Sequence, residues 1–514
     1  SGIIGHFGLG FYSAFMVSDS VEIISKSYKK SSPAIHWSCD GSPEFNLVKS
    51  DKKNRGTEII LNISKDSKSF LEDNTIGDLL KKYNRFMPIP IKFGTKEVSK
   101  KEGEGKKEKE IKETVDNIIN ITEPAWTKNP KDLKEEDYKT FYKDLYPMNF
   151  EDPLFNIHLN VDYPFNLTGI LYFPKITNDI NLQKDKIQLF QNQVFVTDNV
   201  EGIVPEFLTL LRGVIDSPDI PLNVSRSYLQ VDSAVKKISN YITRKVADKL
   251  NSLFKKDRKK FEDKWNDIKV IIEYGMLSED KFFEKSDNFT LYPSTDNNFF
   301  TYDELMKKIK KHHTDKDGKT IILYTSNIEE QDSYIKQANK KGYTVLLLDS
   351  PIVSHLIQKL ETTKEKISFA RVDSDAIENL IKKDEENISK LNEKDEEKLK
   401  LDIEKVVPKE KYTIQLQAMD SEASPFIITQ PEFMRRMKDM QNSGGNSMFG
   451  NMPEMYNLIV NTNNKLISDI LNTKTKSKKE RLIKQSLDLA KLSQNLLKGE
   501  DLTKFIKRSF DLIK

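Results

Sequence analysis

The chain begins with short runs in which hydrophobic and polar positions alternate. Three such runs have strand character and are separated by Ser, Lys, Asp and Gly: residues 21–25, 34–39 and 57–63. This arrangement is typical of an antiparallel meander. Helical patterns flank the runs at residues 11–18 and 66–87, and Pro88 and Pro90 end the second helix. The sequence therefore predicts a mixed start of strands and helices.

Beyond residue 113 the pattern becomes that of an α/β protein. Strands are predicted at residues 155–161, 167–173 and 187–196. A long helix follows, because apolar residues recur at spacings of three and four. Its stripe consists of Val231, Val235, Ile238, Ile242, Val246, Leu250 and Leu253. Residues 320–360 then alternate strand, helix, strand, helix, which predicts parallel strands joined by a right-handed crossover.

The last part of the chain has mainly helical patterns. Residues 377–404 are very highly charged and predict a helix on the surface. Amphipathic spacing returns in the tail at Leu482, Ile483, Leu487, Leu489, Ala490, Leu502, Phe505, Ile506 and Phe510. Short terminal helices with strong apolar faces either pair with a second chain or pack on their own domain.

Composition narrows the function classes. The 514 residues include 82 Lys and Arg against 79 Asp and Glu, a net charge of +3, which argues against nucleic-acid binding as the main role. No apolar run approaches the roughly 20 residues that span a bilayer. The single cysteine, Cys39, rules out an intrachain disulfide and fits a reducing cytosol. We therefore expect a cytoplasmic protein with no nucleic-acid or membrane partner.

One segment interrupts the pattern of strands and helices. Residues 97–113 (KEVSKKEGEGKKEKEIK) are almost entirely charged residues and Gly. Such a stretch buries too little apolar surface to order itself, so it predicts a linker. The expected division is 1–96, the linker 97–113, 114–375 and 376–514.

The opening glycines are a candidate phosphate site. Gly5, Gly8 and Gly10 precede a helical pattern, and glycines let the backbone approach an anion at a helix N-terminus. The spacing is not the dinucleotide fingerprint, because Ser13 stands where its last Gly belongs. A flexible turn is the alternative.

These residues carry a family resemblance. IIGHFGLGFYSAFMVSDSVEIISK resembles the lid-and-phosphate segment of the heat-shock protein 90 chaperones, although the family usually has Gln where this chain has His6. PAWTKNP, EDPLF, LLRGVIDSPDIPLNVSR, FARVDSD and AMDSEASPFIITQPEFMRRMKDM resemble the bacterial, HtpG-like branch. The resemblance implies a multidomain α+β and α/β chain: the remnant of a Bergerat-type (GHKL) α/β sandwich, an α/β middle domain and a mostly helical dimerisation domain.

The resemblance also implies a nucleotide site for ATP with magnesium. The residues that it places there are Gly5, Gly8, Leu9, Gly10, Phe11 and Thr57, with Thr57 reaching the adenine through water. In the family, the Glu that activates water, the Asn that holds magnesium and the Asp that reads adenine lie upstream of the glycine loop, where this chain starts. We therefore expect an ATPase in the full-length parent and an inactive truncated chain.

Residues 221–230 (PLNVSRSYLQ) are the candidate catalytic loop. Asn223 or Ser225 could cap the helix that follows, which places Arg226 in its first turn, against the helix dipole. A residue placed against local preference hints at function, and Arg suits bidentate contact with phosphate. By resemblance, Arg226 reaches the γ-phosphate while Asn223 and Gln230 support the loop. The alternative is a surface salt bridge.

Client binding is expected at two places. Six of the twelve methionines fall between residues 434 and 455: Met434, Met437, Met440, Met448, Met452 and Met455. An exposed Met face binds many shapes weakly, whereas the alternative is ordinary core. The resemblance favours a client patch at Phe433, Met434 and Met437. It also implies client contact at Trp126, for which a buried core position is the alternative.

Three functions follow from these patterns. The first is an ATP-driven dimeric chaperone clamp that binds unfolded clients, a second copy through its C-terminal helices, and other chaperone-system proteins. The second is a nucleotide-independent holdase. The third is another ATPase of the same nucleotide fold, of the DNA-repair or topoisomerase type, which would need basic DNA-contacting surfaces. His312 and His313 are expected in a solvated turn, and no metal site is expected in this chain.

Overall fold

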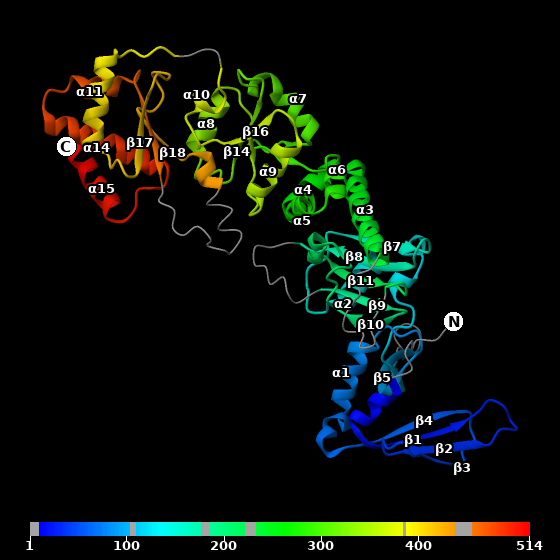
Figure 1. Ribbon diagram of the computed structural model, residues 1–514. Helices are drawn as coiled ribbons and strands as arrows, with labels where there is room; N and C mark the ends of the chain where they lie inside the picture. Colours follow the sequence, from blue (N-terminus) through cyan, green and yellow to red (C-terminus); the bar gives the residue numbers. More distant parts are fainter. Residues whose placement is uncertain are drawn as a thin grey trace. The chain divides into compact units, whose positions relative to one another are not determined.

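Figure 1 shows a computed structural model of the chain, which describes residues 10–102, 109–175, 186–220, 233–383, 387–436 and 455–513. The chain divides into two compact units, Ser1–Val246 and Ala247–Lys514. Both units combine helices with β-sheets, so the coarse expectation of a mixed α/β multidomain chain is confirmed. The boundary falls inside the helix α3 (Ser233–Lys256), whereas the finer division drawn from the sequence stays a prediction.

A four-stranded antiparallel sheet opens the first unit. Its elements are η1 (Gly10–Met16), β1 (Ser18–Lys26), β2 (Ala34–Cys39), β3 (Asn46–Ser50) and β4 (Gly56–Ile63). The strand order is β3-β2-β1-β4, so the predicted meander is wrong in its order, because β4 returns to pair with β1. The pattern also missed β3, whose five residues include only two apolar side chains.

The rest of the first unit is built on a five-stranded sheet. Its elements are η2 (Lys65–Leu71), α1 (Asp73–Tyr83), β5 (Lys92–Glu102), β6 (Lys109–Ile118), η4 (Ala125–Thr127), η5 (Pro130–Asp132), α2 (Glu135–Leu145), β7 (Phe155–Val161), β8 (Leu167–Phe173), β9 (Ile187–Gln191), β10 (Val194–Thr197), η6 (Glu206–Leu210) and β11 (Arg212–Asp216). The sheet order is β10-β9-β11-β8-β7. A Cβ at Gly213 (φ +131°) would lie 2.0 Å from the carbonyl oxygen of Ile170, so this sheet position requires glycine.

Two expected elements of this unit are each split in the structure. The helix predicted at 66–87 becomes η2 and α1, because Glu72 between them is extended (φ −91°, ψ 127°). The strand predicted at 187–196 becomes the hairpin β9–β10, because Asn192 and Gln193 adopt positive φ angles of 52° and 63°. Two consecutive left-handed residues make the tight turn that joins antiparallel strands. The strands predicted at 155–161 and 167–173 are confirmed as β7 and β8.

The charged segment 97–113 is not the unstructured linker that its composition predicts. Its described ends belong to the antiparallel ribbon β5–β6, with Glu97 opposite Thr114 and Ser99 opposite Lys112. Oppositely charged side chains meet across the ribbon, with Lys112 Nζ 3.2 Å from a carboxylate oxygen of Glu97. Backbone pairing and the ion pair between Lys112 and Glu97 hold the described ends of this stretch together. The prediction from composition considered only the free energy gained by burying apolar surface.

The second unit begins with α3 residues and an α/β sandwich. Its elements are α4 (Arg258–Asp263), α5 (Trp265–Ser278), α6 (Asp280–Ser286), β12 (Tyr292–Pro293), β13 (Phe299–Phe300), α7 (Tyr302–His313), β14 (Thr320–Thr325), α8 (Asp332–Lys340), β15 (Val345–Leu347), α9 (Val353–Thr363) and β16 (Ile367–Arg371). β14 pairs in parallel with both β15 and β16, which confirms the predicted crossover. The predicted apolar stripe is confirmed for Val235, Ile238, Ile242, Val246 and Leu250 of α3, which are buried, whereas Leu253 is half-buried and Val231 lies outside the described residues.

His313 corrects the expectation of a solvated turn. It ends α7 and is 1% exposed. Its Nδ1 donates to the carbonyl oxygen of Ile321 at 2.7 Å, and its Nε2 accepts from the backbone N–H of Thr344 at 3.0 Å. These partners fix a neutral imidazole, and burial lowers the pKa of His313 to about 4. The Lys-rich neighbourhood hid the apolar face of α7 on which His313 lies.

The rest of the second unit holds a sheet that the sequence did not predict. Its elements are α10 (Ile377–Leu380), α11 (Glu393–Glu404), β17 (Tyr412–Gln417), β18 (Phe426–Thr429), β19 (Tyr456–Asn461), α13 (Lys465–Asn472), α14 (Lys476–Ser493) and α15 (Gly499–Ile513). The sheet order is β17-β19-β18. The expectation of a mostly helical domain is therefore incomplete. The single charged helix predicted at 377–404 is instead α10 and α11, and the described residues between them, 381–383 and 387–392, are not helical.

Candidate functional site

The described nucleotide candidates lie on the first sheet. Gly5, Gly8 and Leu9 fall outside the described residues, and Gly10 begins η1. The ring of Phe11 packs edge-on against Trp37 of β2, with centroids 5.7 Å apart. Thr57 opens β4, and its hydroxyl lies 2.8 Å from that of Ser25 on β1.

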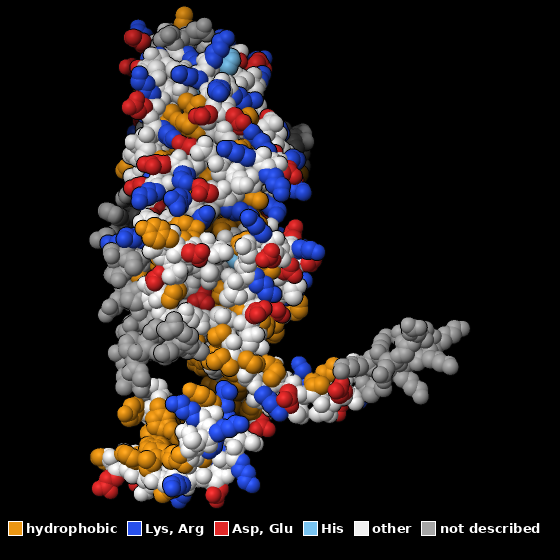
Figure 2. Space-filling model, turned by 90° about the vertical axis from the view of Figure 1, so that its right-hand side faces the viewer, with side chains coloured by type: hydrophobic (Ala, Val, Ile, Leu, Met, Phe, Trp, Pro, Cys, Tyr) orange, Lys and Arg blue, Asp and Glu red, His pale blue; other side chains and the backbone are white. Residues whose placement is uncertain are grey.

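The sheet register brings Phe11 and Thr57 to one face. Ile23 of β1 is opposite both Trp37 and Ile59, so these three side chains share a face. Thr57 is two residues from Ile59 on the same strand and points to the same side. Figure 2 shows hydrophobic side chains gathered over this sheet at the lower end of the view, and Ile59 is 55% exposed. The face thus offers an apolar wall with the paired hydroxyls of Ser25 and Thr57 at its edge.

Within the described residues, no three His, Cys, Asp or Glu side chains converge to hold a metal ion.

This open sheet leads to a prediction about local stability. Every residue of β3 except Ser50, and every residue of β4 except Ile63, is exposed. We expect amides of residues 19–63 to exchange through openings of less than about 5 kcal/mol, the lower end for a folded domain. Hydrogen exchange followed by mass spectrometry measures this, with β8 as the buried reference. Protection of 19–63 equal to that of β8 would contradict it.

The candidate catalytic loop falls outside the described residues. This holds for Arg226, Asn223 and Gln230. The described chain reaches the loop from β11 and leaves it through α3, so the loop joins the five-stranded sheet to the longest helix.

The root of this loop is tightly anchored. The hydroxyl of Ser217 donates to the carbonyl oxygen of Asn166 at 2.6 Å, and the N–H of Asn166 donates to the carboxylate of Asp219 at 2.6 Å. Gln191 on β9 donates to the carbonyl oxygen of Pro218 at 3.2 Å. The sequence analysis did not single out these anchors. The turn-forming run Asp-Ser-Pro-Asp at 216–219 is the signal that could have found them.

Trp126 is a core residue, and the expectation of client contact through an exposed indole is wrong. It is 0% exposed, and its ring centroid lies 4.7 Å from that of Phe86 in an edge-on contact. The indole N–H donates to Asp216 Oδ2 at 3.2 Å, and the backbone N–H of Gln193 donates to the same oxygen at 2.9 Å. Burial raises the pKa of Asp216 despite these donors. The buried alternative is therefore the correct one.

Phe433 lies at the surface, as a client patch requires. Its side chain is 72% exposed and Met434 is half-buried. Met455 is 44% exposed. The methionines that fall outside the described residues are Met437, Met440, Met448 and Met452.

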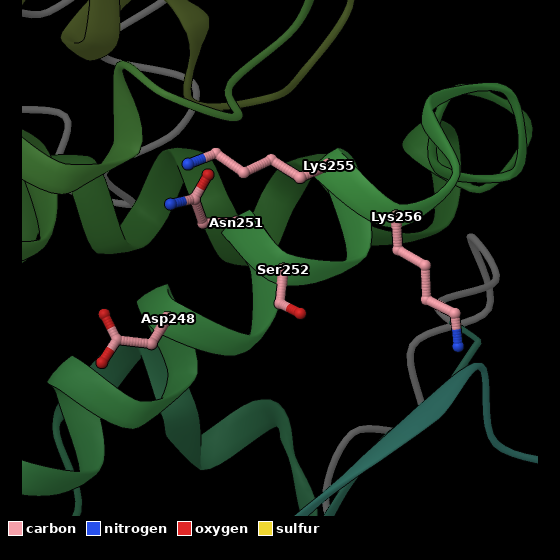
Figure 3. A pocket seen from close by; sticks show the side chains of 5 residues that line it. All are labelled: Asp248, Asn251, Ser252, Lys255 and Lys256. Atoms are coloured by element: carbon pink, nitrogen blue, oxygen red, sulfur yellow. The ribbon is translucent and has the colours of Figure 1, made fainter.

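A groove on α3 coincides with none of the predicted sites. It has a volume of about 560 Å³ and is lined by Asp248, Asn251, Ser252, Lys255 and Lys256. Figure 3 shows these five side chains extending from successive turns of one helix. Asp248 is already paired with Lys285, with 2.7 Å between Nζ and Oδ1. The mixture of charges gives the groove no clear ligand chemistry.

Among the helices that the structure describes, none is both long and apolar enough to span a bilayer.

The family described as Hsp90 protein matches residues 94–513. The chain is 48% identical to the chaperone protein HtpG of Bacteroides thetaiotaomicron, over 99% of this chain and 84% of that protein. It is 50% identical to HtpG of Porphyromonas gingivalis, over 95% of this chain and 71% of that protein. HtpG of Borreliella burgdorferi is 29% identical over 91% of this chain.

The match covers most of the second unit and the five-stranded sheet of the first. High identity extends over nearly the whole length of this chain. The chain therefore belongs to the Hsp90 protein family.

Proposed function

We propose that this protein is an ATP-dependent molecular chaperone of the cytoplasm that works as a nucleotide-driven dimeric clamp. The observation that carries the proposal is the exposed Phe433 beside a half-buried Met434, in a chain of the Hsp90 family. A large aromatic side chain in water is costly unless it has an apolar partner. Unfolded clients provide such partners, so the client patch is Phe433, Met434 and Met437.

The nucleotide part of the cycle belongs to the first unit. Thr57 and Phe11 would face the base and ribose side of ATP, and the backbone of Gly5, Gly8, Leu9 and Gly10 would face its phosphates. ATP supplies a cleavable phosphoanhydride when it is bound. Arg226, held by Asn223 and Gln230, would neutralise charge that develops on the γ-phosphate.

Dimerisation would use the last two helices. Leu489 and Leu492 of α14 and Ile506 and Phe510 of α15 are all more than 40% exposed. A second copy would cover these side chains on both chains at once, because a two-fold interface buries the same surface twice. Other chaperone-system proteins and clients would bind elsewhere on the clamp.

The client patch predicts the outcome of an aggregation experiment. Phe433→Ala should weaken suppression of aggregation of heat-unfolded citrate synthase, so that about tenfold more chaperone is needed. Phe150→Ala is the matched control, because Phe150 is 92% exposed but lies outside the patch. Light scattering measures both. Equal loss in the two variants would refute a specific patch, and suppression that ignores ATP would favour the nucleotide-independent holdase.

Arg226 predicts the outcome of a turnover experiment. In this chain joined to the N-terminal ATP-binding residues of an HtpG relative, Arg226→Ala should lower ATP turnover at least about tenfold, equivalent to about 1.4 kcal/mol of transition-state stabilisation. ATP binding should survive, because the proposed base contacts are untouched. Steady-state phosphate release and equilibrium nucleotide binding measure the two effects. Unchanged turnover would make residues 221–230 a structural loop.

A further inference from the structure

A network of charged side chains fastens the helical residues 432–436 to the α/β part of the second unit. Arg436 lies at its centre. Its Nη1 is 2.7 Å from Glu361 Oε2 on α9, and its Nη2 donates to the carbonyl oxygen of Phe369 on β16 at 2.7 Å. Its Nε donates to Glu432 at 2.7 Å within the same helical turn. One guanidinium thus joins three separate stretches of chain.

A second arginine completes the network from the other side. Arg435 is 3% exposed and bonds Glu432, with 3.2 Å between Nε and Oε2. It also donates to the phenol oxygen of Tyr324 on β14 and lies over that ring. The phenol in turn donates to Glu432 at 3.0 Å. The two arginines lower the pKa of Glu432 although burial alone would raise it.

Glu361 is held in place independently of Arg436. Its carboxylate accepts from the backbone N–H of Phe369 at 2.7 Å and from the hydroxyl of Ser368 at 3.1 Å. It is therefore fixed on the edge of β16 before the arginine binds. A carboxylate oriented by such donors presents its oxygens to the guanidinium in a defined geometry.

The network explains why Phe433 faces solvent. Glu432, Arg435 and Arg436 are spaced i, i+3 and i+4, so they share one face of the helical turn. Phe433 follows Glu432 by about 100° around the axis, away from that face. Most of the stability of a helical stretch in a protein comes from tertiary packing. Its orientation must come from the side chains that anchor it.

We propose that Glu361 and Arg436 are positioning residues that fix the orientation of Phe433 and Met434, and so couple the α/β part of the second unit to the affinity for clients. The inference rests on the proposed client-binding function and adds the residues that act through it. Neither positioning residue needs to touch the client. Partly buried ion pairs such as Arg436–Glu361 are weak sources of stability but can fix geometry, which suits this role.

The test combines client affinity with local exchange. Glu361→Gln keeps an acceptor for the N–H of Phe369 but removes the charge that binds Arg436. The matched control is Glu365→Gln, which changes an exposed residue on the loop that follows α9. We expect Glu361→Gln to weaken binding of reduced, carboxymethylated α-lactalbumin about fivefold. It should raise amide exchange at residues 432–436 while β14 stays as protected as before. The control should change neither.

A double-mutant cycle separates positioning from general damage. Glu361→Gln should have little further effect on affinity in a Phe433→Ala background, because both changes remove the same contact. Additive losses, or unchanged exchange at 432–436, would overturn the inference. If Phe433→Ala alone leaves affinity unchanged, the proposed client patch is wrong, and the exchange result alone then decides whether Glu361 anchors the segment.

Discussion

Replacing Trp126 by alanine is expected to lower the free energy of unfolding of the structure around the five-stranded sheet by about 3–5 kcal/mol. The side chain is fully buried among Phe86, Phe141 and Phe190, so its removal leaves a large cavity. It also removes a donor from Asp216, whose carboxylate is buried. Both terms act in the same direction. Urea denaturation followed by circular dichroism measures the change.

Phe150→Ala is the control for Trp126→Ala. Phe150 is 92% exposed, and surface changes usually stay within about 0.5 kcal/mol. Hydrogen exchange localises the effect of Trp126→Ala, because β8 and β11 should lose protection while the strands β14–β16 keep theirs. A variant that remains stable but binds clients weakly would contradict the core role. Such a result would instead support client contact at Trp126.

The sequence predicted best those elements that bury a continuous apolar stripe. The apolar stripe of α3 and the strands β14 and β15 were predicted correctly, because each element buries its apolar residues on one face or on both. The pattern failed where apolar residues are sparse. β3 and the ribbon β5–β6 are held by backbone pairing, and ladder hydrogen bonds leave no mark in hydrophobic periodicity.

Chain order in sheets was predicted less well than the strands themselves. Nothing in the run at 57–63 says that β4 pairs with β1 and not with β3. The sheet β17-β19-β18 was missed for a related reason. Its strands are separated by long segments, and β19 joins β17 in parallel across more than 30 residues of sequence. Pairing over such distances depends on tertiary contacts.

The candidate client-binding residues were also predicted only in part. Phe433 was placed in an exposed patch by the family resemblance, whereas its methionine-rich context alone favours ordinary core, and the structure exposes it. Its anchors could not be predicted, because Glu361 and Arg436 are 75 residues apart and resemble any other charged pair in a chain with 31% charged residues. Trp126 shows the converse. Its exposure was inferred from a resemblance, while burial is decided by the aromatic side chains around it.

His313→Gln is expected to flatten the acid side of the stability curve of the second unit. In the folded protein the pKa of His313 is lowered to about 4 by burial, with further lowering from Lys383 and His312. The unfolded chain has an ordinary histidine pKa of about 6.5. Between pH 4 and pH 6.5, the imidazole of His313 is mostly protonated in the unfolded chain but mostly neutral in the folded protein. Stability is therefore full above pH 6.5 and falls as the pH drops toward 4, by about 3 kcal/mol in total.

The matched control is His312→Gln, which removes the exposed neighbour on the same turn of α7. Urea midpoints at pH 7, 6, 5 and 4 give the slope for the wild type and for each variant. His313→Gln can lower stability at pH 7, because it loses the ordered ring, yet its slope between pH 6.5 and 4 must still be shallower than that of the wild type. The control should change the slope far less than His313→Gln does, because His312 is the smallest of the influences on the pKa of His313. If His313→Gln loses stability with acid as steeply as the wild type, other buried groups govern the acid response. Glu273 is not among them, because burial raises its pKa to about 7 and a carboxyl raised in this way opposes the loss.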